Sequence, residues 1–455
     1  MASVSISLFR KLQSMKGSPL LSGVLVGGVM TVAVKCIAFS KELVVASRFG
    51  TSDEVDAFLI VGALMIFLSN VLGDSFRDAT VPVYAKLKEK GERLAAGLVS
   101  NMLWICFATA LVVCLFVLVF RYPVTDGLGG GFSEAKKERA GELLFWLFPF
   151  AMFYGMATLL KGYVQANGRF GVSSVAAAVV PLLTIVLLLA IPGAPSATYI
   201  AVGHSVGAFF LFLIVFWAAS RVRGGSILEK PRWDSFTGSA ASHVLPLIIG
   251  ASILEGCVFV DSVMAATLES GSVTVLNYAA KVATIVLSIG GTAAGQVLFP
   301  HVAKLVVKEE WERLVKSVLQ FSLVVFVCSI PFVIFFWVAA EPVVRILFER
   351  GEFTAEDTTR VAEVLQFAGL YIPGFILALL GVRIIMALRA GRILLLTTTF
   401  LLLLNIGLNF AFMKQIGVKG IALSTACVSA ASAVIHYAYF FRRVAVLRKR
   451  AAAGG

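Results

Sequence analysis

Three lysines lie inside long apolar stretches of this chain, where a charged side chain has little water to solvate it: Lys35, Lys41 and Lys281. Neither Lys35 nor Lys281 has an opposite charge three or four residues away, the spacing at which helical neighbours pair. A lone cation at the centre of a membrane helix costs roughly 2.5–3.5 kcal/mol on insertion scales. We therefore expect the lysines to converge on a water-filled cavity, where a diphosphate would suit their compact charges.

Other charges inside the apolar stretches have simpler explanations. Lys41 lies beside Glu42, and both side chains could reach an interface by snorkelling. Asp74, Arg77 and Asp78 can pair with one another near the end of their stretch. Further polar residues inside such stretches are Glu255, Asp261, Arg383, Asn405 and Asn409.

No catalytic or metal-binding motif accompanies these charges. The six cysteines form no CxxC pair and the four histidines are scattered, so the sequence predicts neither a zinc site nor a disulfide framework. The glycine-rich residues 127–131 lack the Lys-Ser/Thr ending of a P-loop, and we interpret residues 121–141 as a linker. We expect no enzyme activity and no cofactor, apart from Na⁺ or H⁺ as a coupling ion.

The elements that position the lysines must be membrane helices. The 455 residues are 59% hydrophobic and 14% charged, with a mean hydropathy of +0.93, whereas soluble domains carry about 25% charged residues. Apolar stretches long enough to cross a bilayer favour helices, which satisfy their own backbone hydrogen bonds. The predicted spans cover residues 20–47, 57–84, 95–120, 142–166, 170–191, 196–220, 240–268, 272–300, 315–340, 361–388, 392–413 and 418–441.

The connections between these spans alternate in charge. Every second connection is rich in Lys and Arg, as in residues 86–93 and 304–316, and both termini are basic; the others are neutral, acidic or mixed. This alternation predicts a multi-pass protein of the bacterial inner membrane with both termini in the cytoplasm and an even number of helices. The net charge of +13 follows from the same rule, so we expect no nucleic-acid partner.

The longest basic connection, residues 221–236, lies near the middle of the chain. It predicts a six-helix lobe of residues 1–220, a cytoplasmic linker and a second six-helix lobe of residues 237–455. The expected fold is therefore an all-α polytopic membrane protein with about twelve transmembrane helices in two lobes around a central cavity. We expect it to function as a monomer in the lipid bilayer.

Several stretches resemble the MurJ/MviN family of lipid II flippases, within the multidrug/oligosaccharidyl-lipid/polysaccharide exporter superfamily. Together they run from about residue 30 to 440. They are Lys35-Cys-Ile-Ala-Phe-Ser-Lys41 with Phe49-Gly50 and Asp56-Ala-Phe, then Val81-Pro82-Val83, Asn277-Tyr-Ala-Ala-Lys281, and Leu347-Phe-Glu-Arg-Gly-Glu-Phe-Thr-Ala-Glu-Asp357. The last is the most specific of them.

The resemblance implies substrate-binding roles for five residues. Lys35, Lys41 and Lys281 match positions where the family has cavity arginines that hold the lipid diphosphate. Asp56 matches a family aspartate near the outer end of the first two helices. Arg383 matches a basic family position in the tenth helix.

The resemblance also implies a cation site in the second lobe. Asn405 and Asn409 are four residues apart, on one face of the eleventh helix, and match a polar pair that helps to form a cation site in some members. Asp261 and Thr425 would complete the site with further oxygen ligands. The predicted guest is a sodium ion.

Some features depart from the family pattern. All three cavity arginines are lysines here, residues 68–70 replace the arginine pair of the second helix, and no counterpart of the family's two further helices follows the twelfth span. These departures keep a cationic cavity but leave the substrate open. It is either lipid II or another polyprenyl-diphosphate-linked glycan, for capsule or exopolysaccharide.

The function we expect is that of a flippase, which moves the lipid-linked saccharide across the inner membrane by alternating access, for peptidoglycan synthesis or polysaccharide export. The alternative is a drug/cation antiporter of the same superfamily, although its site should be acidic or aromatic. A membrane glycosyltransferase or ligase would need a catalytic carboxylate or histidine in a large outer loop, and residues 121–141 contain no histidine. A non-transporting scaffold would not need isolated lysines in its spans.

Overall fold

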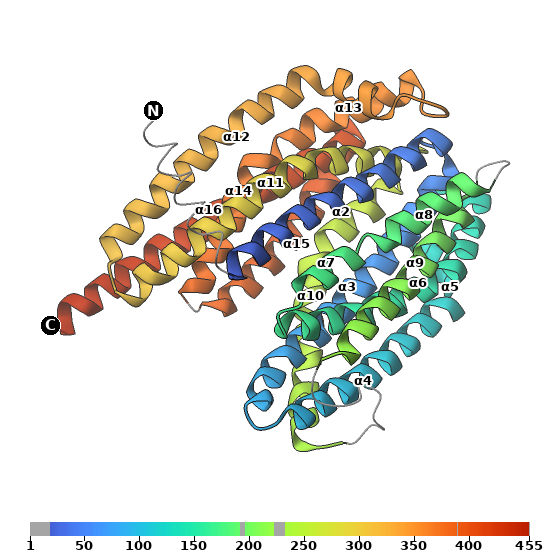
Figure 1. Ribbon diagram of the computed structural model, residues 1–455. Coiled ribbons are helices and arrows are strands. Elements are labelled where there is room, and N and C mark those ends of the chain that lie inside the picture. Colours follow the sequence, from blue (N-terminus) through green and yellow to red (C-terminus); the bar gives the residue numbers. More distant parts are fainter. Residues whose placement is uncertain (1–18, 192–195, 223–232, 389, 455) are drawn as a thin grey trace. The chain divides into compact units, whose positions relative to one another are not determined.

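The structure is a computed structural model that describes residues 19–191, 196–222, 233–388 and 390–454; residues 19–31, 289–300 and 450–454 are described by their backbone alone. Every regular element within these ranges is a helix (Figure 1). The predicted all-α fold is confirmed.

The helices follow one another with short connections. They are α2 (Pro19–Phe49), α3 (Asp53–Lys88), α4 (Glu92–Val119), α5 (Arg121–Leu128), α6 (Glu134–Ala166), α7 (Phe170–Ala176), α8 (Val179–Ala190), α9 (Ala197–Ser220), α10 (Ser235–Ala265), α11 (Ser272–Val307), α12 (Trp311–Phe348), α13 (Ala355–Gly369), α14 (Tyr371–Ala387), α15 (Gly391–Ile416) and α16 (Val418–Gly454). Within the described residues, each predicted span is occupied by one helix or by a helix pair.

Two of the spans are interrupted, and prolines explain both interruptions. A proline ring clashes with the carbonyl group four residues earlier and removes one helical hydrogen bond. For Pro373 that carbonyl belongs to Gly369, where α13 ends, and α14 continues at an angle of 42°. For Pro181 it belongs to Ala177, which separates α7 from α8.

The length and composition of the helices suit a membrane protein. In the described part of the chain, nine helices or continuous stretches are long and apolar enough to cross a bilayer, and the bent α13–α14 pair makes a tenth. A shorter apolar segment, Ser272–Ser288, opens α11. The chain is therefore a multi-pass membrane protein.

The predicted linker at residues 121–141 is wrong. This segment contains α5 and the first two turns of α6, which begins at Glu134 and not at the predicted residue 142. Gly131 approaches the backbone of Thr267 so closely that a Cβ atom there would lie 2.8 Å from its carbonyl carbon. The glycine-rich stretch thus permits close packing.

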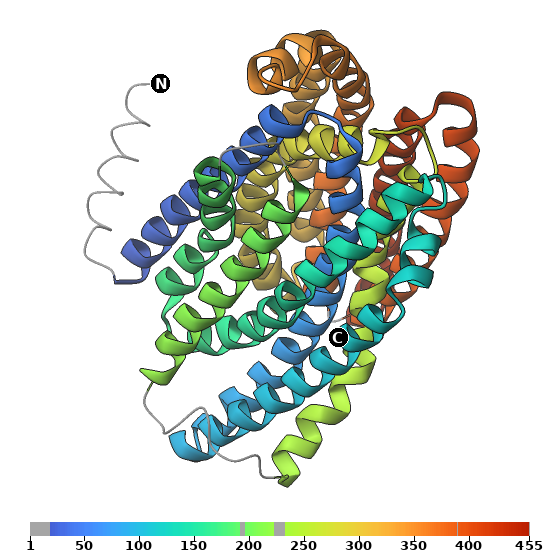
Figure 2. The ribbon, with the colours of Figure 1, turned by 90° about the vertical axis from the view of Figure 1, so that its right-hand side faces the viewer.

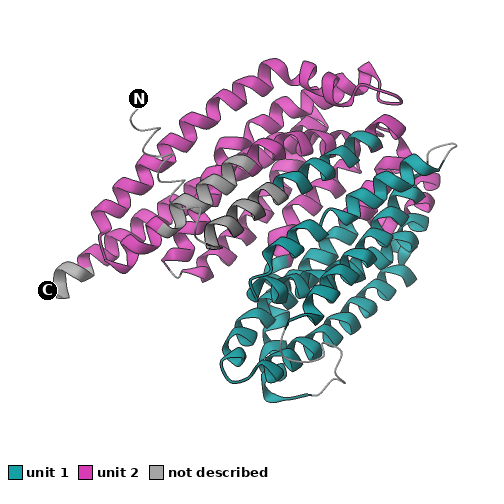
Figure 3. Cartoon of the chain, in the orientation of Figure 1, with its two compact units in different colours: residues 1–44, 64–124, 141–251 teal, residues 45–63, 125–140, 252–455 magenta. Residues whose placement is uncertain are grey.

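The chain forms two compact units (Figure 3). Unit 1 comprises Met1–Val44, Leu64–Val124 and Gly141–Ala251, and unit 2 comprises Val45–Ala63, Thr125–Ala140 and Ser252–Gly455. Most of the predicted linker, residues 223–232, lies outside the described residues, so the division at 221–236 stays a prediction. The N-terminal ends of α3 and α6 belong to unit 2. Their polar contacts with other parts of this unit are described below.

Within each unit, long helices lie side by side (Figure 3), and Figure 2 shows the same ribbon from a second direction. In unit 1, α8 packs against α9. In unit 2, α14 and α15 both pack against α16, and α11 packs against α14. The unit 2 residues singled out above lie on α3, α10, α11, α14, α15 and α16.

Candidate functional site

Asp261, Asn405, Asn409 and Thr425 meet inside unit 2. Asp261 Oδ1 accepts hydrogen bonds from Asn405 Nδ2 at 3.0 Å and from Asn409 Nδ2 at 2.7 Å. Its Oδ2 accepts one from Thr425 Oγ1 at 3.0 Å. The carboxylate comes from α10, the amides from α15 and the hydroxyl from α16. We call these four residues the Asp261 cluster.

The local geometry of α15 explains why its two asparagines act together. A spacing of four residues places both side chains on one face, and both are buried, with 1% and 0% exposure. Oδ1 of Asn409 is buried without a hydrogen-bond partner. Since a buried polar atom without a partner is costly, this oxygen is a candidate ligand for a cation.

The composition of the Asp261 cluster fits a hard monovalent cation. The groups that could bind a cation are a carboxylate, two amides and a hydroxyl. Rotation of an amide group by 180° exchanges its oxygen and nitrogen, so each amide can present its oxygen to a cation. Oxygen atoms are the ligands of hard cations, and one carboxylate balances one positive charge. No group of three or more His, Cys, Asp and Glu residues suited to a metal occurs in the described ranges.

The predicted substrate lysines are divided between the units. Lys35 and Lys41 lie on the part of α2 in unit 1, and Lys281 lies on α11 in unit 2. Lys35 and Lys281 are exposed on the protein surface. Arg383 is also exposed, on α14, which packs against α11. The convergence of the three lysines on one cavity stays a prediction.

Lys41 has a partner on its own helix. Its Nζ atom lies 3.1 Å from Oε1 of Glu42, and the two side chains are 13% and 8% exposed. The two side chains therefore pair with each other, and their predicted reach toward an interface stays a prediction. Lys41 therefore brings less net charge to an anionic guest than Lys35 does.

Asp56 is enclosed, with 1% exposure. Its Oδ1 accepts hydrogen bonds from the backbone N–H and the hydroxyl of Thr274, at 2.8 and 2.5 Å. Its Oδ2 accepts hydrogen bonds from the Gly271 N–H at 2.7 Å and from Lys136 Nζ at 2.9 Å. These four donors occupy the acceptor sites of a carboxylate. In this conformation Asp56 binds the protein itself, and its predicted contact with substrate stays a prediction.

Lys136 is a residue that sequence analysis missed. It lies in the segment taken for a linker, yet its side chain is only 5% exposed and contacts two carboxylates. A local signal did exist, because it is a lysine in a connection expected to be neutral or acidic. Its partners, 80 and 83 residues away, carry no such signal.

The motif at Leu347–Asp357 joins the loop after α12 to the corner between α2 and α3. The Glu352 N–H donates to the Ser47 carbonyl at 2.9 Å, and the Thr51 hydroxyl donates to Asp357 Oδ1 at 2.5 Å. Gly351 has a φ angle of +61°, and a Cβ atom there would lie 2.1 Å from the Ser47 carbonyl oxygen. This motif is an interlock between two loops.

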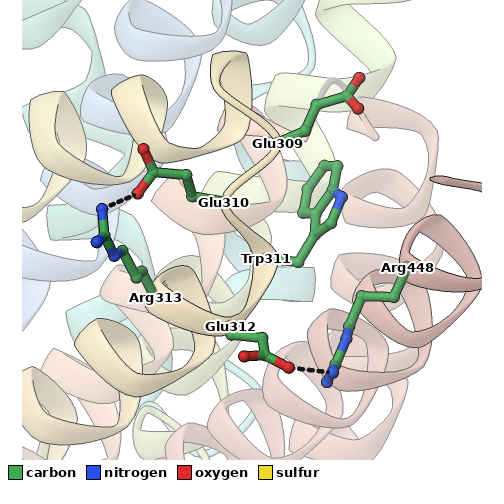
Figure 4. Close-up of a pocket in the computed structure, with 6 residues that line it drawn as sticks. All are labelled: Glu309, Glu310, Trp311, Glu312, Arg313 and Arg448. Atoms are coloured by element: carbon green, nitrogen blue, oxygen red, sulfur yellow. Dashed lines mark hydrogen bonds and ion pairs between the residues drawn. The ribbon is translucent and has the colours of Figure 1, made fainter. Parts of the chain in front are cut away.

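A separate pocket of about 450 Å³ lies at the α11–α12 corner of unit 2 (Figure 4). Glu310 pairs with Arg313 at 2.8 Å, and Glu312 pairs with Arg448 at 2.5 Å. Its carboxylates and guanidinium groups largely balance one another, so it lacks the positive surface that a diphosphate requires.

Long apolar helices with charged groups inside them define the class of this protein as a multi-pass membrane protein. The comparisons identify the family. The family model described as lipid II flippase MurJ matches residues 45–453. The chain belongs to this family of lipid II flippases.

Curated relatives match over most of the chain. A probable lipid II flippase MurJ of Rhizobium tropici is 24% identical over 448 residues, which cover 92% of this chain and 80% of the relative. The corresponding protein of Vibrio cholerae is 25% identical over 357 residues, which cover 75% and 67%. The resemblance stated from the motifs is confirmed.

Solved structures share the fold. A lipid II flippase MurJ in an inward closed conformation matches with a TM-score of 0.80 and 18% identity, covering 90% of this chain and 86% of the other. An inward-facing multidrug resistance MATE family transporter matches with a TM-score of 0.73 and 15% identity, covering 92% and 99%. The two-lobe transporter architecture is thus confirmed.

Proposed function

We propose that this chain moves a polyprenyl-diphosphate-linked saccharide from the inner to the outer leaflet of the bacterial inner membrane. The observation that carries the proposal is the match of a lipid II flippase family model to residues 45–453. The lysines within the membrane-spanning helices support it. Lys35 and Lys281 come from the two different units, and their compact positive charges suit a diphosphate. Lipid II is the first candidate substrate, and a lipid-linked capsule or exopolysaccharide unit is the second.

The transport cycle needs no covalent step. The saccharide diphosphate would enter between the lobes, where lysines offset its charge, while the polyprenyl tail stays in lipid. The lobes would then change from an inward-open to an outward-open state. Both termini would lie in the cytoplasm, as the alternation of basic connections requires. We propose a monomer as the working unit.

The Asp261 cluster would supply the coupling. A sodium ion there would be held by the Asp261 carboxylate, the Asn405 and Asn409 amide oxygens and the Thr425 hydroxyl. The membrane potential would add about 2.3 kcal/mol for each charge moved across 100 mV. A proton is the alternative coupling ion, because Asp261 is ionisable.

The rival functions fit less well. A drug/cation antiporter shares the fold, but cations on α2, α11 and α14 would repel a cationic drug. A glycosyltransferase or ligase would need a catalytic carboxylate or histidine in a large outer loop, and residues 121–141 contain no histidine. Two of the acids in this segment, Asp126 and Glu134, accept hydrogen bonds from Lys137 at 2.6 and 3.0 Å.

Depletion of the protein in its source bacterium tests the proposed function. Lipid-linked saccharides on the cytoplasmic leaflet would then be extracted and identified by mass spectrometry. We expect one polyprenyl-diphosphate saccharide to accumulate there, and its sugar names the substrate. Unchanged levels of every such lipid would reject the proposal.

A further inference from the structure

Lys136 is held by two carboxylates from a neighbouring helix. It lies in the first turn of α6, and its Nζ atom is 2.6 Å from Asp53 Oδ1 and 2.9 Å from Asp56 Oδ2. The same atom lies 4.1 Å from the centre of the Phe132 ring, within the range of a cation–π contact. A lysine that is 5% exposed is rare unless it is paired, and here the pairing is double.

Asp56 takes the place of an N-cap side chain for α11. The N-cap residue of α11 is Gly271, which has no side chain to accept the free N–H groups of the first turn. Asp56 accepts the N–H groups of Gly271 and Thr274 instead, and its negative charge also suits a helix N-terminus. The carboxylate therefore lies between two positive partners, Lys136 and the α11 terminus.

The capped end is connected to the predicted substrate site by one rigid element. Thr274 and Lys281 are seven residues apart on α11, which places them on one face, two turns from each other. A shift of the helix terminus would displace Lys281 along with it. The position of Asp56 therefore affects the position of a predicted substrate lysine.

We propose that Lys136 is a positioning residue of the transporter, which holds Asp56 in the orientation that fixes the α11 terminus and Lys281. This inference rests on the proposed function, since Lys281 matters only if an anionic head group is carried. The contact joins residues 53–56 and 136 to residues 270–274 within unit 2. If the α11 terminus separates from Asp56 during transport, Lys136 remains as a positive partner for the carboxylate.

The test uses the full chain and a matched neighbour. Lys136→Gln removes the buried charge, and Lys137→Gln removes the adjacent lysine, whose partners Asp126 and Glu134 are 71% and 92% exposed. Ser272→Cys, in the first turn of α11, is the reporter because Ser272 is 3% exposed. A membrane-impermeant maleimide labels the new thiol only when the terminus opens, and the parent chain without Ser272→Cys gives the background from native cysteines.

We expect Lys136→Gln to raise the labelling rate roughly tenfold or more and to reduce flipping in proteoliposomes by a similar factor, since one partner of a buried ion pair is removed. Lys137→Gln should change neither quantity. Labelling and flipping like the parent chain in Lys136→Gln would overturn the proposal. Labelling does not depend on substrate, so it decides the role of Lys136 even if the substrate assignment fails.

The double variant Asp56→Asn/Lys136→Gln separates a positioning role from direct substrate contact. A neutral amide needs no counter-charge, and its oxygen can still accept the Thr274 N–H although its NH2 group cannot accept from Gly271, so the double variant should label more slowly than Lys136→Gln alone and faster than the parent chain. If Lys136→Gln folds poorly, the double variant should yield more inserted protein than Lys136→Gln alone. A double variant as impaired as the single one, in labelling or in insertion, would show that Lys136 does not act through Asp56 and would reject the inference.

Discussion

Replacement of Asp261 by Asn should abolish stabilisation of the protein by sodium. The substitution keeps the shape of the side chain and removes the single charge that the Asp261 cluster offers to a cation. Three polar side chains now donate to this carboxylate, at 2.7–3.0 Å. Without sodium, Asp261→Asn should unfold at or above the temperature of the parent chain, because a buried charge without a cation is costly.

The size of the sodium effect follows from linkage. A ligand at one hundred times its dissociation constant stabilises the folded state by about 2.7 kcal/mol. For a chain of this length, that free energy corresponds to a rise in Tm of about 3 °C. Asn409, whose Oδ1 atom is buried without a partner, should gain a partner when the ion binds.

The assay is thermal unfolding of the purified full-length chain in detergent, with sodium chloride or choline chloride at equal ionic strength. The parent chain should gain stability in sodium, and Asp261→Asn should show no difference between the salts. Glu255→Gln is the matched control, because it removes another acid from the same helix, outside the Asp261 cluster. A sodium shift that survives in Asp261→Asn, or that is absent from the parent chain, would refute the cation site.

Three other changes have definite expected outcomes. Lys35→Ala and Lys281→Ala should each abolish or strongly reduce flipping in proteoliposomes while insertion is unchanged. At the same positions Lys→Arg should be tolerated, and Lys→Glu should reduce flipping most. Normal transport by both alanine variants would contradict the cationic cavity. Gly351→Ala should lower stability in thermal unfolding by at least about 1–3 kcal/mol, the cost of a strained backbone, while Gly97→Ala, whose Cβ would meet nothing within 4 Å, should not. Reporter fusions at Gly129 and Gly225 should report opposite sides of the membrane, and the same side for both would contradict the topology.

The sequence predicted the positions of the membrane spans well, and their ends less well. Hydropathy marks the thickness of the bilayer, whereas a helix continues until a capping residue or a proline stops it. α6 therefore begins eight residues before its predicted span, at Glu134, and α16 continues past residue 441 to Gly454. The break before α14 was predictable in principle from Pro373, but hydropathy alone does not register it.

The Asp261 cluster was accessible from the sequence because part of its signal is local. Two asparagines at a helical spacing inside an apolar span are unusual, and the resemblance to a family supplied their partners. The junction at Asp56 carried no such signal. Its donors come from α6 and from the start of α11, 80 to 218 residues away, and two of them are backbone N–H groups whose positions depend on the fold.

The most direct test of the account is a leaflet assay with the purified full-length chain. Proteoliposomes would receive a polyprenyl-diphosphate saccharide, and a membrane-impermeant enzyme that modifies the sugar would report how much of it reaches the opposite leaflet. The account predicts rapid transfer by the parent chain and transfer near the protein-free rate by the Lys35→Ala/Lys281→Ala variant. Equal transfer by the parent chain and this variant, or no transfer above protein-free vesicles for any polyprenyl-diphosphate saccharide, would contradict it.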